Sequence, residues 1–469
     1  MQAKNRSQAN TPLSARIRSF CRDRKPEVII ICCALAALGI ALLRYLKEDP
    51  LTSLYQWDAV IIDLALYCFI GIVFVVKLGS SWRRPAQPAE ARHEGFRRYA
   101  LIFMMMLAVH SVRILAAYAL QALETGEFPA FRDALNVWKA PDSVHYMNIA
   151  SHWYRGLEEN GVVWRLVFLP FYPILIKGFS FITGENFISG MIVSVLSSSL
   201  AGCVLYALAR FDMDEAYAHR AVKYFVLLPT AFFYTTAMTE SLFILLSLLC
   251  IYGARKRKWI LAGVAGGLAA FTRSVGVILI APVLLEWIGT LIAEHGKDRI
   301  KALLLGFALA LIPLGFAAYL YINYAETGDP LTFMTYQKEH WFQQPGPFFG
   351  SVRYQLEYLI GYLKNGQYST AMGLSIPNLV SQFAALGLMA ATARKQRTSY
   401  LLYFLAYFAA AMGVTWLLSA PRYLLVLFPI VFAVANLTKK RQVDTAVTVL
   451  FAVLGALYFL AYYKQYAVY

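Results

Sequence analysis

An acidic residue, a histidine and several aromatic side chains crowd into one short stretch of the chain, residues 138–154. Within it, Asp142, His145 and Tyr146 follow directly after Pro141. Proline suits the first position of a helix, and an acidic residue in the first turn is stabilised by the helix dipole. A carboxylate can also accept a hydroxyl proton or bind a cation. Asp142 is therefore a candidate catalytic base, and the alternative is a charge that only stabilises a helix start.

Further polar residues interrupt apolar stretches elsewhere in the chain: Glu240, Arg273, Arg422 and Tyr423. Ionisable groups at membrane depth are costly and are functional candidates by default. The alternatives are a helix N-terminal charge for Glu240, and interfacial snorkelling or pairing with a buried acid for the arginines. Arginine is suited to phosphate, because its guanidinium is always charged and binds in a bidentate manner. A phosphate, a hydroxyl nucleophile and an apolar surround together suggest group transfer from a lipid phosphate.

The composition is that of a polytopic helical membrane protein. Of 469 residues, 59% are hydrophobic and only 15% are charged, whereas soluble domains average about 25% charged residues. Apolar windows long enough to span a bilayer recur along the chain. The net charge of +16 does not indicate nucleic-acid binding, because many basic residues form short clusters between apolar segments, as the positive-inside rule places cytoplasmic loops. These clusters lie at 1–26, 83–98, 255–258, 394–397 and 439–441. The six cysteines make no metal-ligand spacing, and we expect neither structural disulfides nor a cysteine metal site.

Placing the basic clusters in the cytoplasm predicts the path of the chain. It gives about thirteen transmembrane helices, a cytoplasmic N-terminus, and an external tail at 462–469. Segments 122–187 and 323–370 become large external loops, and the apolar run near 168–182 becomes a juxtamembrane helix lying in the interface. The predicted spans lie near 27–46, 59–78, 99–121, 188–209, two in 221–254, two in 259–290, and near 303–322, 371–392, 400–418, 423–437 and 443–461. This topology places all the candidate residues at the outer surface.

At these residues the sequence resembles the GT-C superfamily of membrane glycosyltransferases, and within it the bacterial relatives of GPI mannosyltransferase II. The matching motifs, in the order of the family, are Asp142-Ser-Val-His-Tyr-Met-Asn-Ile-Ala, Phe168-Leu-Pro-Phe-Tyr-Pro-Ile-Leu, Leu228-Pro-Thr-Ala-Phe-Phe, Thr239-Glu-Ser-Leu-Phe, Trp259-Ile-Leu-Ala-Gly-Val-Ala-Gly-Gly-Leu-Ala-Ala-Phe-Thr-Arg-Ser, Gly328-Asp-Pro-Leu-Thr-Phe and Ser419-Ala-Pro-Arg-Tyr-Leu-Leu-Val-Leu-Phe-Pro. The resemblance covers roughly 100–437. It departs from the family at Pro141, where tryptophan usually precedes the aspartate.

The resemblance implies sugar transfer, with mannose expected, from a polyprenyl-phosphate donor to a hydroxyl acceptor at the extracytoplasmic face of the plasma membrane. By motif, Asp142 is the central acidic residue, and Glu240 would position the acceptor or a divalent cation. Arg273, Arg422 and Tyr423 would bind the donor phosphate region, and His145 and Tyr146 would line the pocket. Segment 99–461 would be the GT-C-like module, and segment 1–98, with two helices and a basic linker, an N-terminal addition.

Two other functional classes stay open at this level. A flippase for lipid-linked sugars would need the same basic and apolar groove but no base, so it should tolerate Asp142→Asn. A purely structural or assembly protein of the membrane would tolerate most changes at the candidate residues. The sequence leaves the acceptor, the sugar, metal dependence and oligomeric state open.

Overall fold

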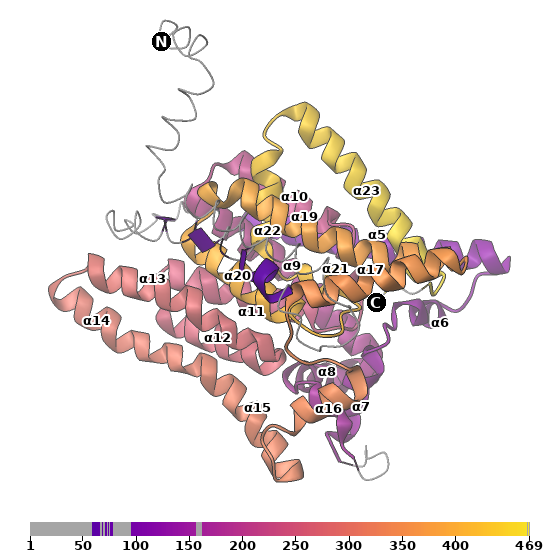
Figure 1. Ribbon diagram of the computed structural model, residues 1–469, viewed down its shortest axis with the longest axis horizontal. Coiled ribbons are helices and arrows are strands. Elements are labelled where there is room, and N and C mark those ends of the chain that lie inside the picture. Colours follow the sequence, from indigo (N-terminus) through magenta and orange to yellow (C-terminus); the bar gives the residue numbers. More distant parts are fainter. Residues whose placement is uncertain are drawn as a thin grey trace, which may run out of the picture.

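The computed structural model describes residues 59–65, 68, 71–72, 74, 76–77, 95–155, 162–466 and 468. In these residues the fold is helical, with an isolated antiparallel bridge between Pro345 and Val414, which confirms the predicted all-α class (Figure 1). The predicted helix near 27–46 and most of the basic linker 79–98 lie outside the described residues. From Phe96 onward the longer helices are α5 (Phe96–Thr125), α7 (Ser143–His152), α8 (Phe171–Thr183), α9 (Asn186–Asp212), α10 (Glu215–Leu227), α11 (Glu240–Arg255), α12 (Trp259–Thr272), α13 (Ile280–Ala293), α14 (Gly296–Gly306), α15 (Leu311–Thr327), α16 (Thr332–Trp341), α17 (Phe348–Lys364), α19 (Ile376–Thr392), α20 (Thr398–Met412), α22 (Phe428–Leu437) and α23 (Arg441–Tyr463). Short helices α6 (Phe131–Ala134), α18 (Tyr368–Thr370) and α21 (Ala420–Leu424) lie between them.

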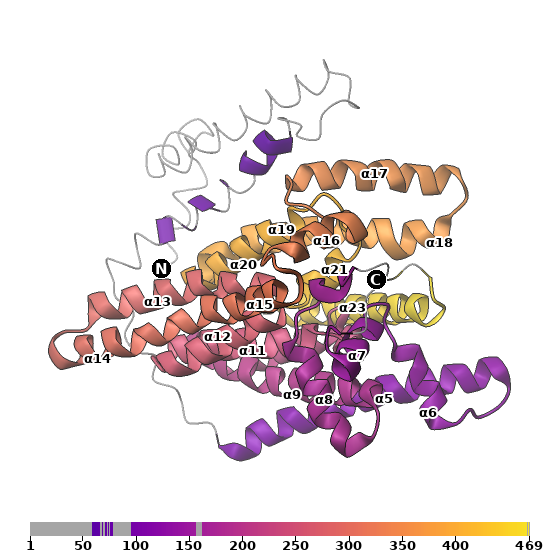
Figure 2. The ribbon, with the colours of Figure 1, turned by 90° about the horizontal axis from the view of Figure 1, so that it is seen from below.

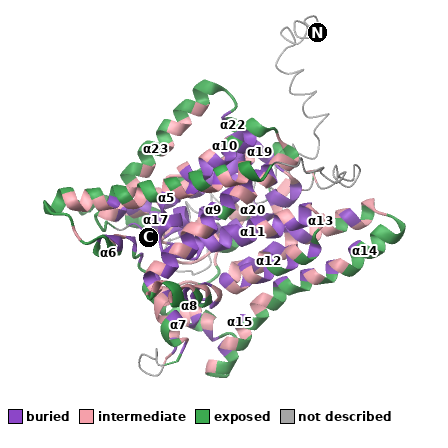
Figure 3. Cartoon of the chain, turned by 180° about the vertical axis from the view of Figure 1, so that it is seen from behind, coloured by how far each residue is buried: buried purple, intermediate pink, exposed green. Residues whose placement is uncertain are grey.

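The core of the bundle is formed by α11 and α22, which are buried along nearly their whole length. The outer helices α5, α14, α15 and α23 are rich in exposed side chains (Figure 3). In α23 the exposed residues are largely apolar, and Tyr462 is the one fully buried side chain. An apolar helix with so little protein contact is stable where lipid covers it. The outer helices therefore form the lipid-facing surface.

Six described helical segments are long and apolar enough to cross a membrane: Phe96–Thr125, Asn186–Asp212, Ser274–Ala293, Gly296–Thr327, Tyr368–Lys395 and Arg441–Tyr463. The predicted total of thirteen spans stays a prediction. The predicted juxtamembrane segment forms α8, whose 13 residues span about 20 Å and are too short for a hydrocarbon core of about 30 Å. This length agrees with the predicted interfacial helix.

Two breaks in the apolar segments were predicted, and the structure confirms both. The first separates α10 from α11, with a 3₁₀ segment at Ala231–Thr235 just after Pro229. The second separates α12 from α13, with an extended residue at Arg273 followed by a 3₁₀ segment. Proline and the run of threonines account for the first break, because neither sustains a helix well. The breaks leave Glu240 and Arg273 at helix ends, where their side chains can meet.

Helix α12 packs so closely on α15 that glycine is required along the contact. A Cβ atom at Gly267 would lie 2.5 Å from the carbonyl oxygen of Leu311 in α15. One at Gly263 would overlap the carbonyl oxygen of Ala308, in the 3₁₀ segment Phe307–Ala310 that leads into α15. Small residues four apart are the usual means by which membrane helices approach this closely. The glycines of the Trp259 motif therefore fix α12, and with it the position of Arg273 at its end.

The bundle has two polar ends, which we call the site end and the basic end. Helix α11 runs from Glu240 at the site end to Arg255 at the basic end, a distance of about 22 Å for 15 residue steps. The helical fragments before residue 78 run the same way. Asp63 accepts hydrogen bonds from the backbone at the start of α17, and Lys77 donates to the carbonyl oxygen of Ala393 at the basic end. The predicted cytoplasmic clusters 255–258 and 394–397 thus lie at the same end, opposite the candidate site.

Candidate functional site

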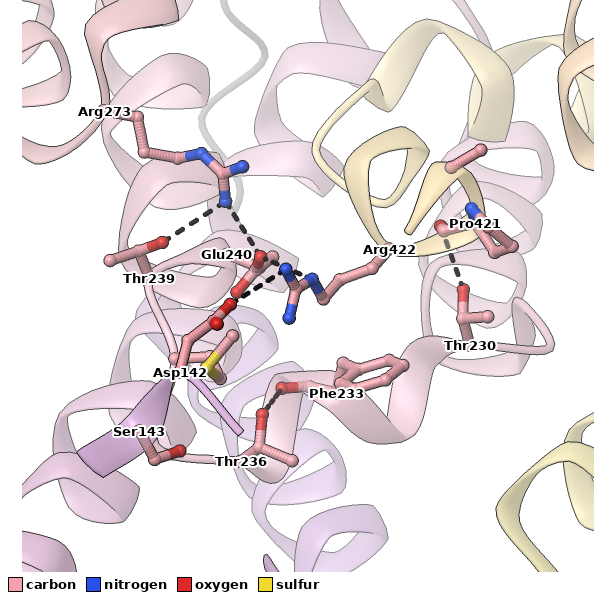
Figure 4. A network of polar contacts seen from close by, with 12 residues as sticks. Asp142, Ser143, Thr230, Phe233, Thr236, Thr239, Glu240, Arg273, Pro421 and Arg422 are labelled. Carbon is pink, nitrogen blue, oxygen red and sulfur yellow. Dashed lines mark hydrogen bonds and ion pairs between the residues drawn. The ribbon is translucent and has the colours of Figure 1, made fainter. Parts of the chain in front are cut away.

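Four charged side chains from distant parts of the sequence form a continuous chain of ion pairs, which we call the charge chain: Asp142, Arg422, Glu240 and Arg273 (Figure 4). Arg422 Nη2 lies 3.0 Å from Asp142 Oδ2, and its Nε lies 3.4 Å from Glu240 Oε1. Arg273 Nη1 lies 2.8 Å from the same Glu240 oxygen and 3.2 Å from Thr239 Oγ1. Acidic and basic groups therefore alternate, and the four formal charges cancel.

Asp142 does not serve as the capping group of its helix. Helix α7 begins at Ser143, two residues after the start predicted at Pro141. Asp142 therefore stands at the N-cap position and not in the first turn, and its carboxylate makes no capping hydrogen bond. It turns instead toward Arg422. Glu240 is the first residue of α11, where the dipole favours a negative charge, and it too faces the arginines. A purely helix-stabilising role therefore does not account for Asp142.

Buried hydrogen bonds hold the segments of the charge chain in register. Ser143 Oγ donates to the carbonyl oxygen of Ala237, which ties the start of α7 to the segment before Glu240. The backbone N–H of Ala420 donates to Asn378 Oδ1, which fixes the start of the short helix that carries Arg422. Because the side chains that anchor these loops are buried, the carboxylates and guanidiniums are positioned before any ligand binds.

Burial distinguishes the two carboxylates. The Glu240 side chain is 1% exposed, while that of Asp142 is 26% exposed. The arginines lie between, at 7% for Arg422 and 17% for Arg273. Glu240 Oε2 has no hydrogen-bond partner among the described residues. Asp142 is thus the carboxylate that a substrate can reach, and Glu240 is the buried counter-charge between the two arginines.

The charge chain borders a large cavity of about 1180 Å³. Its polar wall includes Asp142, Glu240, Arg273 and Arg422. Its apolar wall comes from the segment before α8, from the start of α16, from the end of α20 and from the loop after α20, with these residues among others: Val167, Phe168, Phe333, Met334, Ala410, Val414 and Leu418. Binding pockets commonly combine apolar walls with a few convergent polar groups. The cavity is large enough for a sugar phosphate with part of a lipid chain.

The second predicted external loop covers this cavity. It contains helices α16 and α17 (Figure 2). Helix α16 brings Lys338, His340 and Trp341 to the cavity wall. Trp341 packs on Trp164 and Phe168 of the first loop, with ring centroids 5.4 and 5.6 Å apart. The loop is fixed further by a backbone hydrogen bond from Gly346 to Gly413. The two predicted external loops therefore meet over the site and close it on one side.

The structure places the other predicted site residues as follows. Tyr146 lines the cavity, and burial raises the pKa of its hydroxyl, which therefore stays protonated at neutral pH. Tyr423 also lines it, with its ring 5.4 Å from the Arg273 guanidinium and 5.6 Å from that of Arg422. His145 is not part of the cavity wall, since its ring stacks on Phe168 at 4.7 Å and meets Trp164 at 4.9 Å. It supports the wall from behind.

Two cavity residues were not found from the sequence. Lys338 is exposed, lines the cavity, and pairs with no carboxylate among the described residues. Tyr407 of α20 is fully buried, and its hydroxyl has no hydrogen-bond partner in the described part of the chain. Lys338 lies in a segment that the topology predicted only as an external loop, and Tyr407 lies in an apolar run that contains several tyrosines. No local pattern distinguished either residue.

A divalent cation would have few ligands here. No group of three or more His, Cys, Asp or Glu side chains with metal-site geometry occurs in the described residues. The two carboxylates of the cavity already face arginines. The arrangement is suited to accepting a proton at Asp142 and to holding an anion beside Arg273, Arg422 and Lys338.

Comparisons with known proteins found partial matches. Residues 169–321, about a third of the chain, match the family model described as dolichyl-phosphate-mannose-protein mannosyltransferase. The matched segment contains Glu240 and Arg273. No match was found among curated proteins.

Two solved structures are similar at 15% sequence identity. One is the Saccharomyces cerevisiae protein O-mannosyltransferase Pmt1-Pmt2 complex bound to the sugar donor, with a TM-score of 0.38 over 51% of this chain and 35% of the other. The other is ArnT from Cupriavidus metallidurans bound to undecaprenyl phosphate, with a TM-score of 0.45 over 78% of this chain and 75% of the other. This chain thus spans about a third of the length of the Pmt chain that it matches.

Proposed function

We propose that this chain, a membrane glycosyltransferase of the GT-C superfamily, transfers mannose from a polyprenyl-phosphate donor to a hydroxyl acceptor at the extracytoplasmic face of the membrane. The observation that carries the proposal is the accessible carboxylate of Asp142, held by Arg422 at the wall of a large cavity with both polar and apolar sides. The match to the dolichyl-phosphate-mannose family model supports the donor class.

Asp142 acts as the general base of a single displacement. The acceptor oxygen attacks the anomeric carbon from the side opposite the phosphate, and the bond from that carbon to the phosphate oxygen breaks. The electron pair leaves with the polyprenyl phosphate, and the hydroxyl proton passes to Asp142. Arg422 donates a hydrogen bond to Asp142 Oδ2, which orients the carboxylate. Oδ1 is then left to accept the hydrogen bond, and the proton, of the acceptor hydroxyl. The product has the inverted anomeric configuration.

The arginines and Lys338 balance the charge of the leaving phosphate. Among the described residues, Arg273 donates hydrogen bonds only through Nη1, to Glu240 and Thr239, so its other nitrogens are available to a ligand. Lys338 adds a cation without a carboxylate partner. Preorganised positive groups at the point where charge develops are commonly the largest contribution to catalysis. Glu240 keeps both guanidiniums in place and is a positioning residue in this scheme.

The direct test incubates purified full-length protein with labelled polyprenyl-phosphate mannose and a membrane extract that supplies acceptors. We expect label to move to an acceptor and free polyprenyl phosphate to appear in equal amount. The matched control is Asp142→Asn, which should form both products about 10²–10⁴-fold more slowly. If wild-type protein moves the intact labelled lipid across a vesicle membrane without cleaving it, and the Asn variant does the same, the protein is a flippase and the proposal is wrong.

A further inference from the structure

Two buried polar atoms at the cavity have no hydrogen-bond partner among the described residues: Glu240 Oε2 and the hydroxyl oxygen of Tyr407. Both residues line the cavity, and both are closed to bulk solvent, with exposed fractions of 1% and 0%. A ligand therefore has to reach these atoms from inside the cavity. A buried polar group without a partner costs free energy, so an unpaired group in a binding cavity calls for a partner on the ligand.

Tyr407 lies deeper in the bundle than the charge chain. It stands five residues before the end of α20, about 7.5 Å along the helix axis from the site end. Its ring packs on Phe243, one turn beyond Glu240 in α11, with centroids 6.1 Å apart. Its hydroxyl faces the charge chain, because it interacts electrostatically with both Arg273 and Glu240. Tyr407 thus forms the inner end of the cavity.

The two unpaired atoms differ in what they require of a ligand. Glu240 Oε1 already serves both arginines, and Oε2 can only accept a hydrogen bond, because an ionised carboxylate has no donor. The Tyr407 hydroxyl can donate and accept. A sugar hydroxyl also does both, so it can donate to Glu240 Oε2 while it accepts from Tyr407. The phosphodiester of a lipid-linked sugar has no donor, and its charge would be repelled by Glu240.

We propose that Tyr407, together with Glu240 Oε2, binds a hydroxyl group of the donor sugar and is a specificity-determining residue. This inference rests on the proposed function, because it takes the polyprenyl-phosphate sugar as the ligand of the cavity. The phosphate stays with the cations of the polar wall, and the sugar enters the inner end. A sugar without this hydroxyl would leave both buried atoms unpaired, and sites that hydrogen-bond a substrate hydroxyl reject analogues that lack it.

The test measures the affinity of purified full-length protein for two probes, polyprenyl-phosphate mannose and polyprenyl phosphate without a sugar. Tyr407→Phe removes the hydroxyl and keeps the ring. It should weaken binding of the mannose lipid about fivefold, the scale of one hydrogen bond, and leave the affinity for polyprenyl phosphate unchanged. The thermal unfolding midpoint of Tyr407→Phe without ligand should equal or exceed that of wild type, because no hydrogen bond to the described residues is lost.

The matched control is Tyr462→Phe. Tyr462 is also buried, and its hydroxyl also has no partner among the described residues, but Tyr462 is not one of the residues that line the cavity. The control should bind both probes like wild type. Unchanged binding of the mannose lipid by Tyr407→Phe, or an equal loss in the control, would overturn the inference. An equal loss for both probes in Tyr407→Phe would assign the hydroxyl to the phosphate and would overturn it as well.

Donor analogues test the contact from the side of the ligand. In a series of lipids, one hydroxyl of mannose at a time is replaced by hydrogen. With one of these analogues, wild type and Tyr407→Phe should bind equally, because the contact is already missing. A difference of about fivefold that persists with every analogue would contradict the inference.

The same titrations separate this inference from the proposed function. If wild type does not bind polyprenyl-phosphate mannose, the donor class of the proposed function is wrong, and the inference fails with it. If wild type binds and transfers the sugar while Tyr407→Phe binds it equally well, the inference alone is overturned.

Discussion

Neutralising Glu240 should destabilise the protein far more than neutralising a carboxylate of a surface ion pair. Glu240 is 1% exposed and is the shared partner of Arg273 and Arg422. In Glu240→Gln two buried guanidiniums would keep only Asp142 as their counter-charge. Breaking a buried pair by removing one partner costs about 3–5 kcal/mol. This agrees with an interaction of about 4 kcal/mol for charges 4 Å apart at an effective dielectric constant near 20.

The assay is the thermal unfolding midpoint in one detergent, with Glu215→Gln as the matched control. Glu215 also pairs with an arginine, Arg98, but the two side chains are 49% and 35% exposed. We expect little change for the control, because solvent screens an exposed pair. A second variant, Glu240→Gln with Arg273→Gln, removes one uncompensated charge. It should be less destabilised than the sum of its single variants.

Two results would refute this reasoning. The first is a midpoint for Glu240→Gln that matches the midpoint for Glu215→Gln. That result would mean that Glu240 does not act as a buried counter-charge. The second is strict additivity of Glu240→Gln and Arg273→Gln, which would mean that the two side chains do not interact.

Three further predictions concern the donor, the helix packing and the topology. Lys338→Gln should weaken binding of a polyprenyl-phosphate sugar about fivefold, whereas Lys364→Gln, at the far end of the same loop, should not; equal affinities of the two variants in a donor titration would exclude Lys338. Gly267→Val should destabilise the protein by about 1–3 kcal/mol in thermal unfolding, because its side chain would meet the backbone of α15, and a wild-type midpoint would contradict that packing. A cysteine at exposed Glu127 should react with an impermeant thiol reagent outside intact cells and one at exposed Lys440 should not; the reverse pattern would invert the orientation.

The sequence was informative about helices and about their interruptions. Hydropathy predicts membrane helices well, because a backbone in lipid must satisfy its own hydrogen bonds and an apolar segment does so by forming a helix. The break around Pro229 was visible because proline cannot continue a helix. The break at Arg273, between α12 and α13, could be predicted because a charged residue interrupts an apolar segment there. Both breaks turned out to hold residues of the charge chain.

Pairing among the candidate residues could not be predicted from the sequence. Topology placed Asp142, Glu240, Arg273 and Arg422 at one surface, but their order in the charge chain depends on side-chain packing across separate helices. A local pattern also cannot show that Glu240 is buried while Asp142 is accessible. The same limit explains His145, which shares the stretch of Asp142 but stacks behind the cavity wall.

The sequence also did not predict that the second external loop covers the cavity, for a related reason. The second predicted external loop came from placing the basic clusters in the cytoplasm, and that placement does not specify which residues the loop contacts. Its helix α16 reaches the first loop only through aromatic contacts such as Trp341 on Trp164. Contacts between residues so far apart in the chain have no local signature.

The central claim is that Asp142 is the base of a glycosyl transfer, and comparing transfer with donor binding in Asp142→Asn tests it most directly. Asparagine keeps an oxygen that can accept the hydrogen bond from Arg422, so the fold and donor affinity should survive. It cannot take the acceptor proton, and transfer should fall about 10²–10⁴-fold. Asp142→Glu moves the charge by about 1 Å and should lie between Asn and wild type. Retention of more than about a tenth of wild-type transfer by Asp142→Asn, with unchanged donor binding, would contradict the account.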